Sequence, residues 1–133
     1  MKKLLGLLFL TGVLVSCEKK EDVGNSVDLI GKWKLVEVLI DPGDGSGSFS
    51  KVDSKKMIEF TSNGRVTSNG SICVMSNETD LSGEGTFSLT DSTINAKDCN
   101  GFLPYETRFS CKENFLYVYY PCVEACIEKY IKE

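Results

Sequence analysis

The side chains that could do chemistry in this 133-residue chain are six cysteines, a set of carboxylates and a few lysines and tyrosines; histidine is absent. Without histidine the chain cannot build a Ser-His-Asp or Cys-His catalytic group, or a zinc site that needs imidazole. Glu37 and Glu59 lie within apolar segments and could act as an acid and a base if both faced inward. The solvent face of a half-buried strand explains both positions more simply, so we expect no catalytic residue and no enzyme.

Cys17 stands apart from the other cysteines because it ends a signal-like N-terminus. Lys2 and Lys3 precede an apolar run from Leu4 to Val15, which is too short for a comfortable transmembrane helix. The sequence Leu14-Val15-Ser16-Cys17 resembles the bacterial lipobox, in which the cysteine is lipidated and the preceding peptide is removed. This resemblance implies a signal peptide over residues 1–16 and a membrane anchor of palmitate-like acyl chains on Cys17. An ordinary signal cut elsewhere and an uncleaved membrane helix are the alternatives.

Residues 17–28 are polar and charged, and we expect them to be the lipidated cysteine and a flexible tether. Lys20-Glu21-Asp22 resembles the export signal of some Gram-negative surface lipoproteins, although short charge runs are usually only solvated linkers. The expected location is therefore the outer membrane of a bacterial cell envelope, with surface exposure left open. Loss of Lys2 and Lys3 would lower the formal net charge from −4 to −6, and such a chain offers no basic surface for nucleic acid.

Residues 29–133 have the length of one small domain. Short apolar segments separated by turn residues predict an all-β chain. The expected strands lie over 29–40, 56–60, 65–67, 85–89, 92–95, 105–111 and 115–120, with 126–132 as a last strand or short helix. Asn63-Gly64 and Lys112-Glu113-Asn114 are hairpin signals, and a second Asn-Gly pair, Asn69-Gly70, precedes the segment 71–75. Asp41 to Ser48 is expected as a long polar loop. Eight or nine short strands predict an antiparallel up-and-down barrel or a sandwich.

The start of this domain resembles the lipocalins. Gly31-Lys32-Trp33 is similar to their Gly-x-Trp signature, and Ile58-Glu59-Phe60, Asn63-Gly64 and Val66-Thr67 are similar to the second hairpin of the small lipocalin-like lipoproteins of bacteria. The resemblance implies a small up-and-down barrel that binds a small hydrophobic or amphipathic molecule, and we expect about eight short strands held together by disulfides. It also implies that a basic side chain crosses Trp33.

Three basic residues are candidates for that crossing, Arg108, Lys129 and Lys132. The chain is shorter than a true lipocalin, and Leu89-Thr90-Asp91-Ser92 lacks the tyrosine of the lipocalin Thr-Asp-Tyr motif. An eight-stranded barrel with short strands can be filled by its own side chains.

Four aromatic residues at strand positions are the candidate ligand-binding residues: Trp33, Phe60, Phe87 and Phe109. Ordinary core packing is the alternative for each of them. The segment Phe115 to Tyr120 is apolar or aromatic on both faces, so it is either fully covered or carries an exposed patch for a partner. A protein-interaction module, such as an envelope-anchored enzyme inhibitor or accessory subunit, is therefore the alternative function.

The five remaining cysteines are expected to form two disulfides, because a lipoprotein folds in an oxidising compartment. Cys73 and Cys99 lie near turns, and Cys122 and Cys126 flank a corner led by Pro121. We predict the pairs Cys73–Cys99 and Cys122–Cys126, and Cys111 as a buried thiol; cross-pairing such as Cys99–Cys122 stays open. Cys122 and Cys126 could supply two thiolate ligands, but no second closely spaced pair completes a metal site, so we expect neither a metal nor a cofactor.

Overall fold

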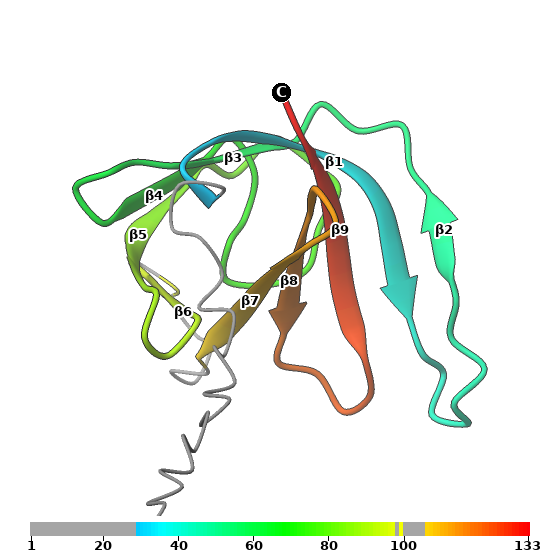
Figure 1. Ribbon diagram of the computed structural model, residues 1–133. Helices are drawn as coiled ribbons and strands as arrows, with labels where there is room; N and C mark the ends of the chain where they lie inside the picture. Colours follow the sequence, from blue (N-terminus) through cyan, green and yellow to red (C-terminus); the bar gives the residue numbers. More distant parts are fainter. Residues whose placement is uncertain (1–28, 98, 100–105) are drawn as a thin grey trace, which may run out of the picture.

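The computed structural model describes residues 29–97, 99 and 106–133, which form nine β-strands of one antiparallel sheet (Figure 1). In chain order these are β1 (Gly31–Ile40), β2 (Phe49–Lys51), β3 (Met57–Phe60), β4 (Arg65–Ser68), β5 (Gly83–Ser88), β6 (Thr93–Ala96), β7 (Thr107–Lys112), β8 (Phe115–Tyr120) and β9 (Cys126–Lys132). The predicted signal peptide, Cys17 and the tether lie outside the described residues.

Pairing between the first and the last strand closes the sheet into a barrel. β1 is paired with β9 from Trp33 to Ile40, and each strand from β3 to β8 pairs with the next one along the chain. Because β1 also pairs with β3, an eight-stranded up-and-down barrel results from β1 and β3 to β9. Closure gives these strands partners on both sides, which protects their backbone groups from pairing with other chains. The predicted all-β barrel of about eight short strands is confirmed.

β2 is an additional strand that lies outside the closed ring (Figure 1). β3 pairs with Gly31–Lys34 of β1, and β2 pairs with Glu37–Leu39 farther along the same edge of β1. β2 was not among the predicted strands, because a strand of three residues is too short for its alternation of polar and apolar residues to be recognised.

A β-bulge in β1 changes which side chains face the barrel interior. Strict alternation along the strand would place Trp33, Leu35 and Leu39 on one face, and Trp33 and Leu35 are buried. The register shifts between Leu35 and Glu37, so that Val38 packs against the core while Leu39 lies on the outer face. A bulge adds one residue to one strand of a pair and thereby reverses the alternation beyond it.

The two predicted hairpin turns are present. Gly64 adopts a φ of +82° between β3 and β4, where a side chain would be strained. Glu113 and Asn114 have φ values of +53° and +70° and form the two-residue connection between β7 and β8. Positive φ at both central residues matches the twist of the flanking strands in such short hairpins.

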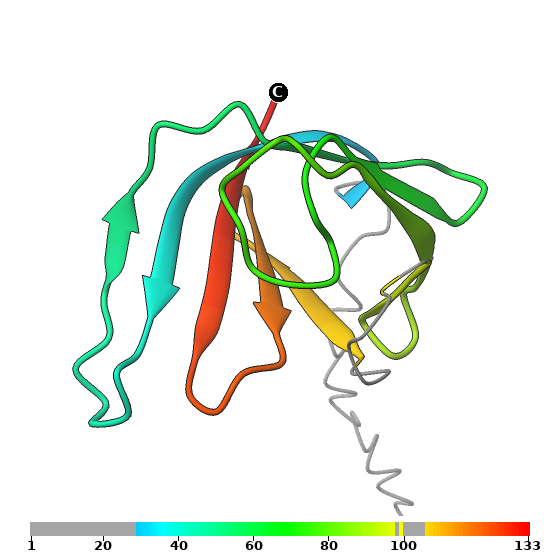
Figure 2. The ribbon, with the colours of Figure 1, turned by 180° about the vertical axis from the view of Figure 1, so that it is seen from behind.

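A long irregular loop, residues 69–82, crosses the mouth of the barrel (Figure 2). Ile72 in this loop is almost fully buried and belongs to the hydrophobic core. The segment 71–75, which follows the second Asn-Gly pair, is therefore part of a loop that closes the barrel end and not a strand of the sheet.

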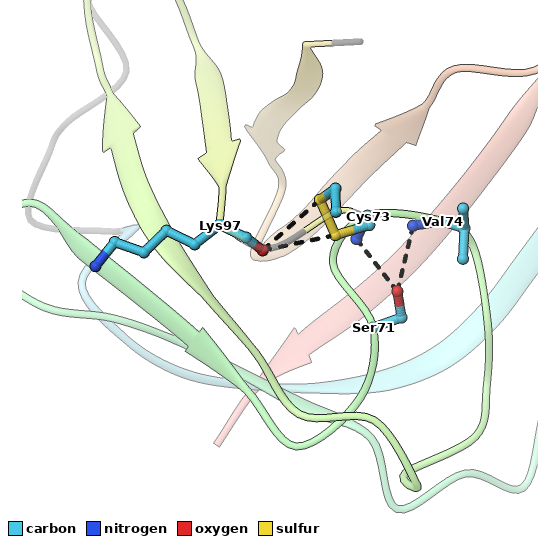
Figure 3. The surroundings of a disulfide bond; sticks show 5 residues. Ser71, Cys73, Val74 and Lys97 are labelled. Atoms are coloured by element: carbon cyan, nitrogen blue, oxygen red, sulfur yellow. Dashed lines mark hydrogen bonds between the residues drawn. A yellow bond between two sulfur atoms is a disulfide. The ribbon is translucent and has the colours of Figure 1, made fainter. Parts of the chain in front are cut away.

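Two disulfides fasten the connections between strands, with the predicted pairing. Cys73–Cys99 joins the 69–82 loop to the segment after β6, and Cys122–Cys126 spans the corner before β9. Their Cα–Cα distances of 5.5 and 6.1 Å are within the usual range of roughly 4.4–6.8 Å. Beside the first disulfide, the Ser71 hydroxyl accepts hydrogen bonds from the backbone N–H groups of Cys73 and Val74 (Figure 3).

The expectation of a buried thiol at Cys111 is wrong. Cys111 is in neither disulfide and its side chain is exposed. Thr107 and Phe109 on the same side of β7 are buried, but Cys111 lies two residues before the hairpin turn, where β7 has passed the end of the core.

Candidate functional site

The candidate ligand-binding aromatics lie in the hydrophobic core. Phe60 and Phe109 are almost fully buried, and Phe87 is partly buried against the same core. Their ring centroids are 5.1 Å apart for Phe60–Phe87, 5.6 Å for Phe60–Phe109 and 6.4 Å for Phe87–Phe109. These are ordinary distances for edge-to-face aromatic packing, so the three rings fill this part of the interior themselves.

Trp33, the fourth candidate, is contacted at its indole N–H and on the face of its ring. Its indole N–H donates to the Leu29 carbonyl at 2.8 Å, and the Lys132 ammonium lies 5.3 Å from the ring centroid. Of the three basic residues considered for crossing Trp33, Lys132 is therefore the one that lies over its ring. A satisfied N–H and a cation over the ring indicate a structural role for this tryptophan.

A buried ion pair occupies another part of the barrel interior. Lys56, just before β3, and Glu128, on β9, both have fully buried side chains. The Lys56 Nζ lies 2.9 Å from each oxygen of the Glu128 carboxylate and 2.8 Å from the Ser76 carbonyl oxygen. The ammonium thus donates to both the carboxylate and the loop that covers the barrel mouth.

Three further donors surround the Glu128 carboxylate. The backbone N–H of Ser76 donates to it at 2.9 Å, the Tyr120 hydroxyl donates at 2.9 Å, and the Tyr130 hydroxyl donates as well. Burial and the negative charge of Glu128 raise the pKa of both tyrosines well above the usual value, so both stay neutral donors. Burial lowers the pKa of Lys56, and the carboxylate opposes this shift.

We interpret this buried network as structural. It ties the start of β3, the 69–82 loop, β8 and β9 to one carboxylate, and both charged side chains are closed to solvent. The network was not predicted from the sequence, although one signal was present: alternation along β9 places Glu128 on the same face as Tyr130. No sequence signal identified Lys56 as its partner, because the two residues are 72 positions apart.

An open pocket lies on the outer face of the barrel, against β1 and β9. It has a volume of about 430 Å³ and is bounded by the bulged part of β1, by the segment leading from β2 to β3, and by side chains of β8 and β9. Its apolar lining consists of Leu35, Val36, Val52, Phe115 and Ile131. None of the four candidate aromatics is part of this lining.

Charged side chains from three parts of the chain complete the pocket. They are Lys34, Lys51 and Lys129, with Glu37 and Asp53. Lys129 and Glu37 form a half-buried ion pair at 2.6 Å, and the same ammonium lies 4.3 Å from the centroid of Phe115 and 5.5 Å from that of Phe49. The hydrogen bond to Glu37 raises the pKa of Lys129, which therefore carries its charge at neutral pH.

The two carboxylates considered for acid–base chemistry do not meet. Glu37 pairs with Lys129 on the outer face, whereas Glu59 lies on β3 opposite Lys32 and Thr67. The arrangement fits the simpler explanation, in which each lies on the outer side of its strand. Among the described residues, no group of three or more cysteine, aspartate or glutamate side chains could hold a metal ion.

The two faces of β8 differ in burial. Leu116 and Val118 are fully buried inside, whereas Phe115 and Tyr117 on the outer face are only half-buried and Tyr119 is 38% exposed. β8 therefore carries a partly exposed aromatic patch beside the pocket.

Comparisons of this chain with protein-family models, with curated proteins and with solved structures found no match. A search of the described residues found no helix that is long and apolar enough to cross a membrane.

Proposed function

We propose that this protein is a lipid-anchored lipoprotein of the bacterial cell envelope whose lipocalin-like barrel binds a small amphipathic molecule without catalysis. The observation that carries the proposal is the 430 Å³ pocket on the outer face, with an apolar lining and charged side chains around it. Small-molecule sites are concave and mainly apolar, with a few polar groups, and this pocket falls in their usual size range of roughly 300–1,000 Å³.

The contents of the barrel interior support an external site. The packed phenylalanine rings, the Lys56–Glu128 pair and the 69–82 loop occupy the space in which a wider barrel would hold a ligand. The proposal therefore places the ligand against β1 and β9 and gives Trp33, Phe60, Phe87 and Phe109 a core role.

A non-catalytic role fits the state of the ionisable groups at the pocket. Glu37 is engaged by Lys129, and the pKa of Lys129 is raised, which makes Lys129 a poor base at neutral pH. A general base needs a pKa near the working pH, and Lys129 does not meet that requirement, while Glu37 is held in its ion pair.

Replacing Ile131 with tryptophan is expected to fill the pocket and to reduce ligand retention about tenfold, since a loss of roughly 1.4 kcal/mol of binding energy has that effect. Native mass spectrometry of protein purified from its own envelope would measure the retained mass. Ile127→Trp is the matched control, because Ile127 lies on the same outer face of β9 but does not line the pocket. Retention of a ligand by both variants alike would contradict the proposed site.

Replacing Cys17 with alanine is expected to move most of the protein from the membrane fraction to the soluble fraction, because acyl chains supply the membrane affinity. Fractionation and immunoblotting would measure the distribution, and intact mass would report the acyl chains. Cys111→Ala serves as the control and should stay with the membrane. If Cys17→Ala remains in the envelope fraction, the anchor proposal is wrong.

A second function, that of a protein-interaction module, is favoured by the aromatic patch on β8. Tyr119 is 38% exposed and Ile131 is 43% exposed, next to the half-buried Phe115 and Tyr117. Exposed apolar groups gathered in one place often mark a surface for a partner. Co-purification of a stoichiometric protein with the wild type, lost in Tyr119→Glu, would favour this function over ligand binding.

A further inference from the structure

We propose that the molecule bound in the outer pocket carries an anionic group, a carboxylate or a phosphate, at the end of an apolar body. This inference rests on the proposed function and adds the charge of the ligand. It follows from three features of the pocket: its balance of charges, the lysine beside its apolar wall, and the position of Lys129.

The charged side chains of the pocket are mostly positive, whereas the chain as a whole is negative. The lining contains three lysines and two carboxylates, whereas the whole chain has a formal net charge of −4. Glu37 is already neutralised by Lys129 at 2.6 Å. Lys34 and Lys51 are exposed and form no ion pair with any residue that the structure describes, so Asp53 is the one carboxylate of the lining left to balance their two charges. The residual charge of the pocket is positive.

Apolar and charged side chains lie next to each other in the pocket. Phe115 and Ile131 lie side by side in the β8–β9 register and supply an apolar wall, and Lys34 of β1 is the register partner of Ile131 on its other side. An apolar body against Phe115 and Ile131 would therefore bring its polar end within reach of a lysine. A cationic end would be repelled by the ammonium groups, and a neutral end would gain hydrogen bonds without the charge attraction that an anion adds.

Lys129 is held in place beside the apolar wall. Its ammonium is fixed by Glu37 and by the faces of Phe115 and Phe49. A cation that is already positioned loses little conformational entropy when an anion approaches it. It can therefore orient the anionic group while Lys34 and Lys51 adapt to it.

A head-group series at constant chain length tests the inference. The probes are octanoate, octyl phosphate, 1-octanol and octylammonium, titrated calorimetrically into the full chain in phosphatidylcholine nanodiscs, with protein-free nanodiscs as the blank. The expected result is that octanoate or octyl phosphate binds about tenfold more tightly than octanol, the scale expected for two partly exposed charge pairs. Octylammonium should bind most weakly. The stronger of the two anions identifies a carboxylate or a phosphate as the preferred group, and its affinity should fall with added salt.

The variant Lys34→Gln/Lys51→Gln locates the effect. It should weaken binding of the anionic probe about tenfold and leave binding of octanol unchanged. The matched control is Arg65→Gln/Lys97→Gln, which removes the same number of positive charges. Arg65 and Lys97 form the exposed ion pairs with Glu84 of β5, away from the pocket lining. Equal effects of both double variants would overturn the assignment to this pocket.

The remaining outcomes separate this inference from the proposed function. If octanol or octylammonium binds as tightly as the anions, the inference is overturned and a binding pocket remains. If none of the four probes binds, and Ile131→Trp changes nothing, the proposed ligand-binding function is itself overturned.

Discussion

Glu128→Ala is expected to lower the free energy of unfolding by about 3–5 kcal/mol, because it leaves Lys56 buried without its carboxylate. The substitution also removes the acceptor of the Tyr120 and Tyr130 hydroxyls and of the Ser76 N–H. A small domain is typically stable by only about 5–15 kcal/mol, so the loss would be a large fraction of the total. Urea denaturation followed by the fluorescence of Trp33, the single tryptophan, would measure it.

Two companion variants make this prediction specific. Glu84→Ala removes an exposed carboxylate that pairs with Arg65 and Lys97, and it should cost less than about 1 kcal/mol. The double variant Lys56→Met/Glu128→Gln removes both charges but keeps an acceptor oxygen, so it should recover most of the lost stability. If Glu128→Ala were no more destabilising than Glu84→Ala, the buried network would not hold the barrel together as we infer.

Cys73→Ser/Cys99→Ser is expected to cost about 3–4 kcal/mol. The two cysteines are 26 positions apart, and the stabilisation from closing a loop in the unfolded chain grows with its length. Loss of this disulfide also releases the loop that carries Ile72 into the core. Chemical denaturation would give the change in free energy, and hydrogen exchange would show whether the amides of residues 69–82 lose protection first.

The shorter disulfide provides an internal comparison. Cys122 and Cys126 are four positions apart, so removing their bond should cost only about 2 kcal/mol in the same chain-entropy model. Cys111→Ser, at an exposed position outside both disulfides, should change stability by less than about 0.5 kcal/mol. A larger loss for the short loop than for the long one would show that strain or residual structure dominates over loop entropy.

Much of the barrel follows from local patterns in the sequence. The hairpins at Asn63-Gly64 and Glu113-Asn114 are set by residues that tolerate a positive φ, and strand alternation identifies Trp33, Leu35, Ile58 and Phe60 as core residues. The Cys122–Cys126 disulfide was predictable because a tight corner brings together two cysteines that are four positions apart. Such features depend on neighbours within a few residues, which is the range over which sequence patterns carry information.

The candidate site could not be read from those patterns. The pocket combines β1, the segment after β2, β8 and β9, and the bulge after Leu35 decides that Glu37 faces outward beside Lys129. A shift of register by one residue moves each following side chain to the opposite face of the strand. No local pattern in the sequence of β1 indicates that shift. The aromatic candidates were identified as interior residues, but whether an interior is hollow or filled depends on how side chains from opposite walls meet.

The sequence by itself determined the all-β class of the fold, the turns and the absence of histidine chemistry, because each depends on residue type and short spacing. Only the tertiary structure decided that the 69–82 loop closes the barrel, that Lys56 meets Glu128 across 72 positions, and that the pocket lies outside the ring of strands. These contacts join segments that are distant in the chain, and strand register and chain closure, which no single segment encodes, bring them together.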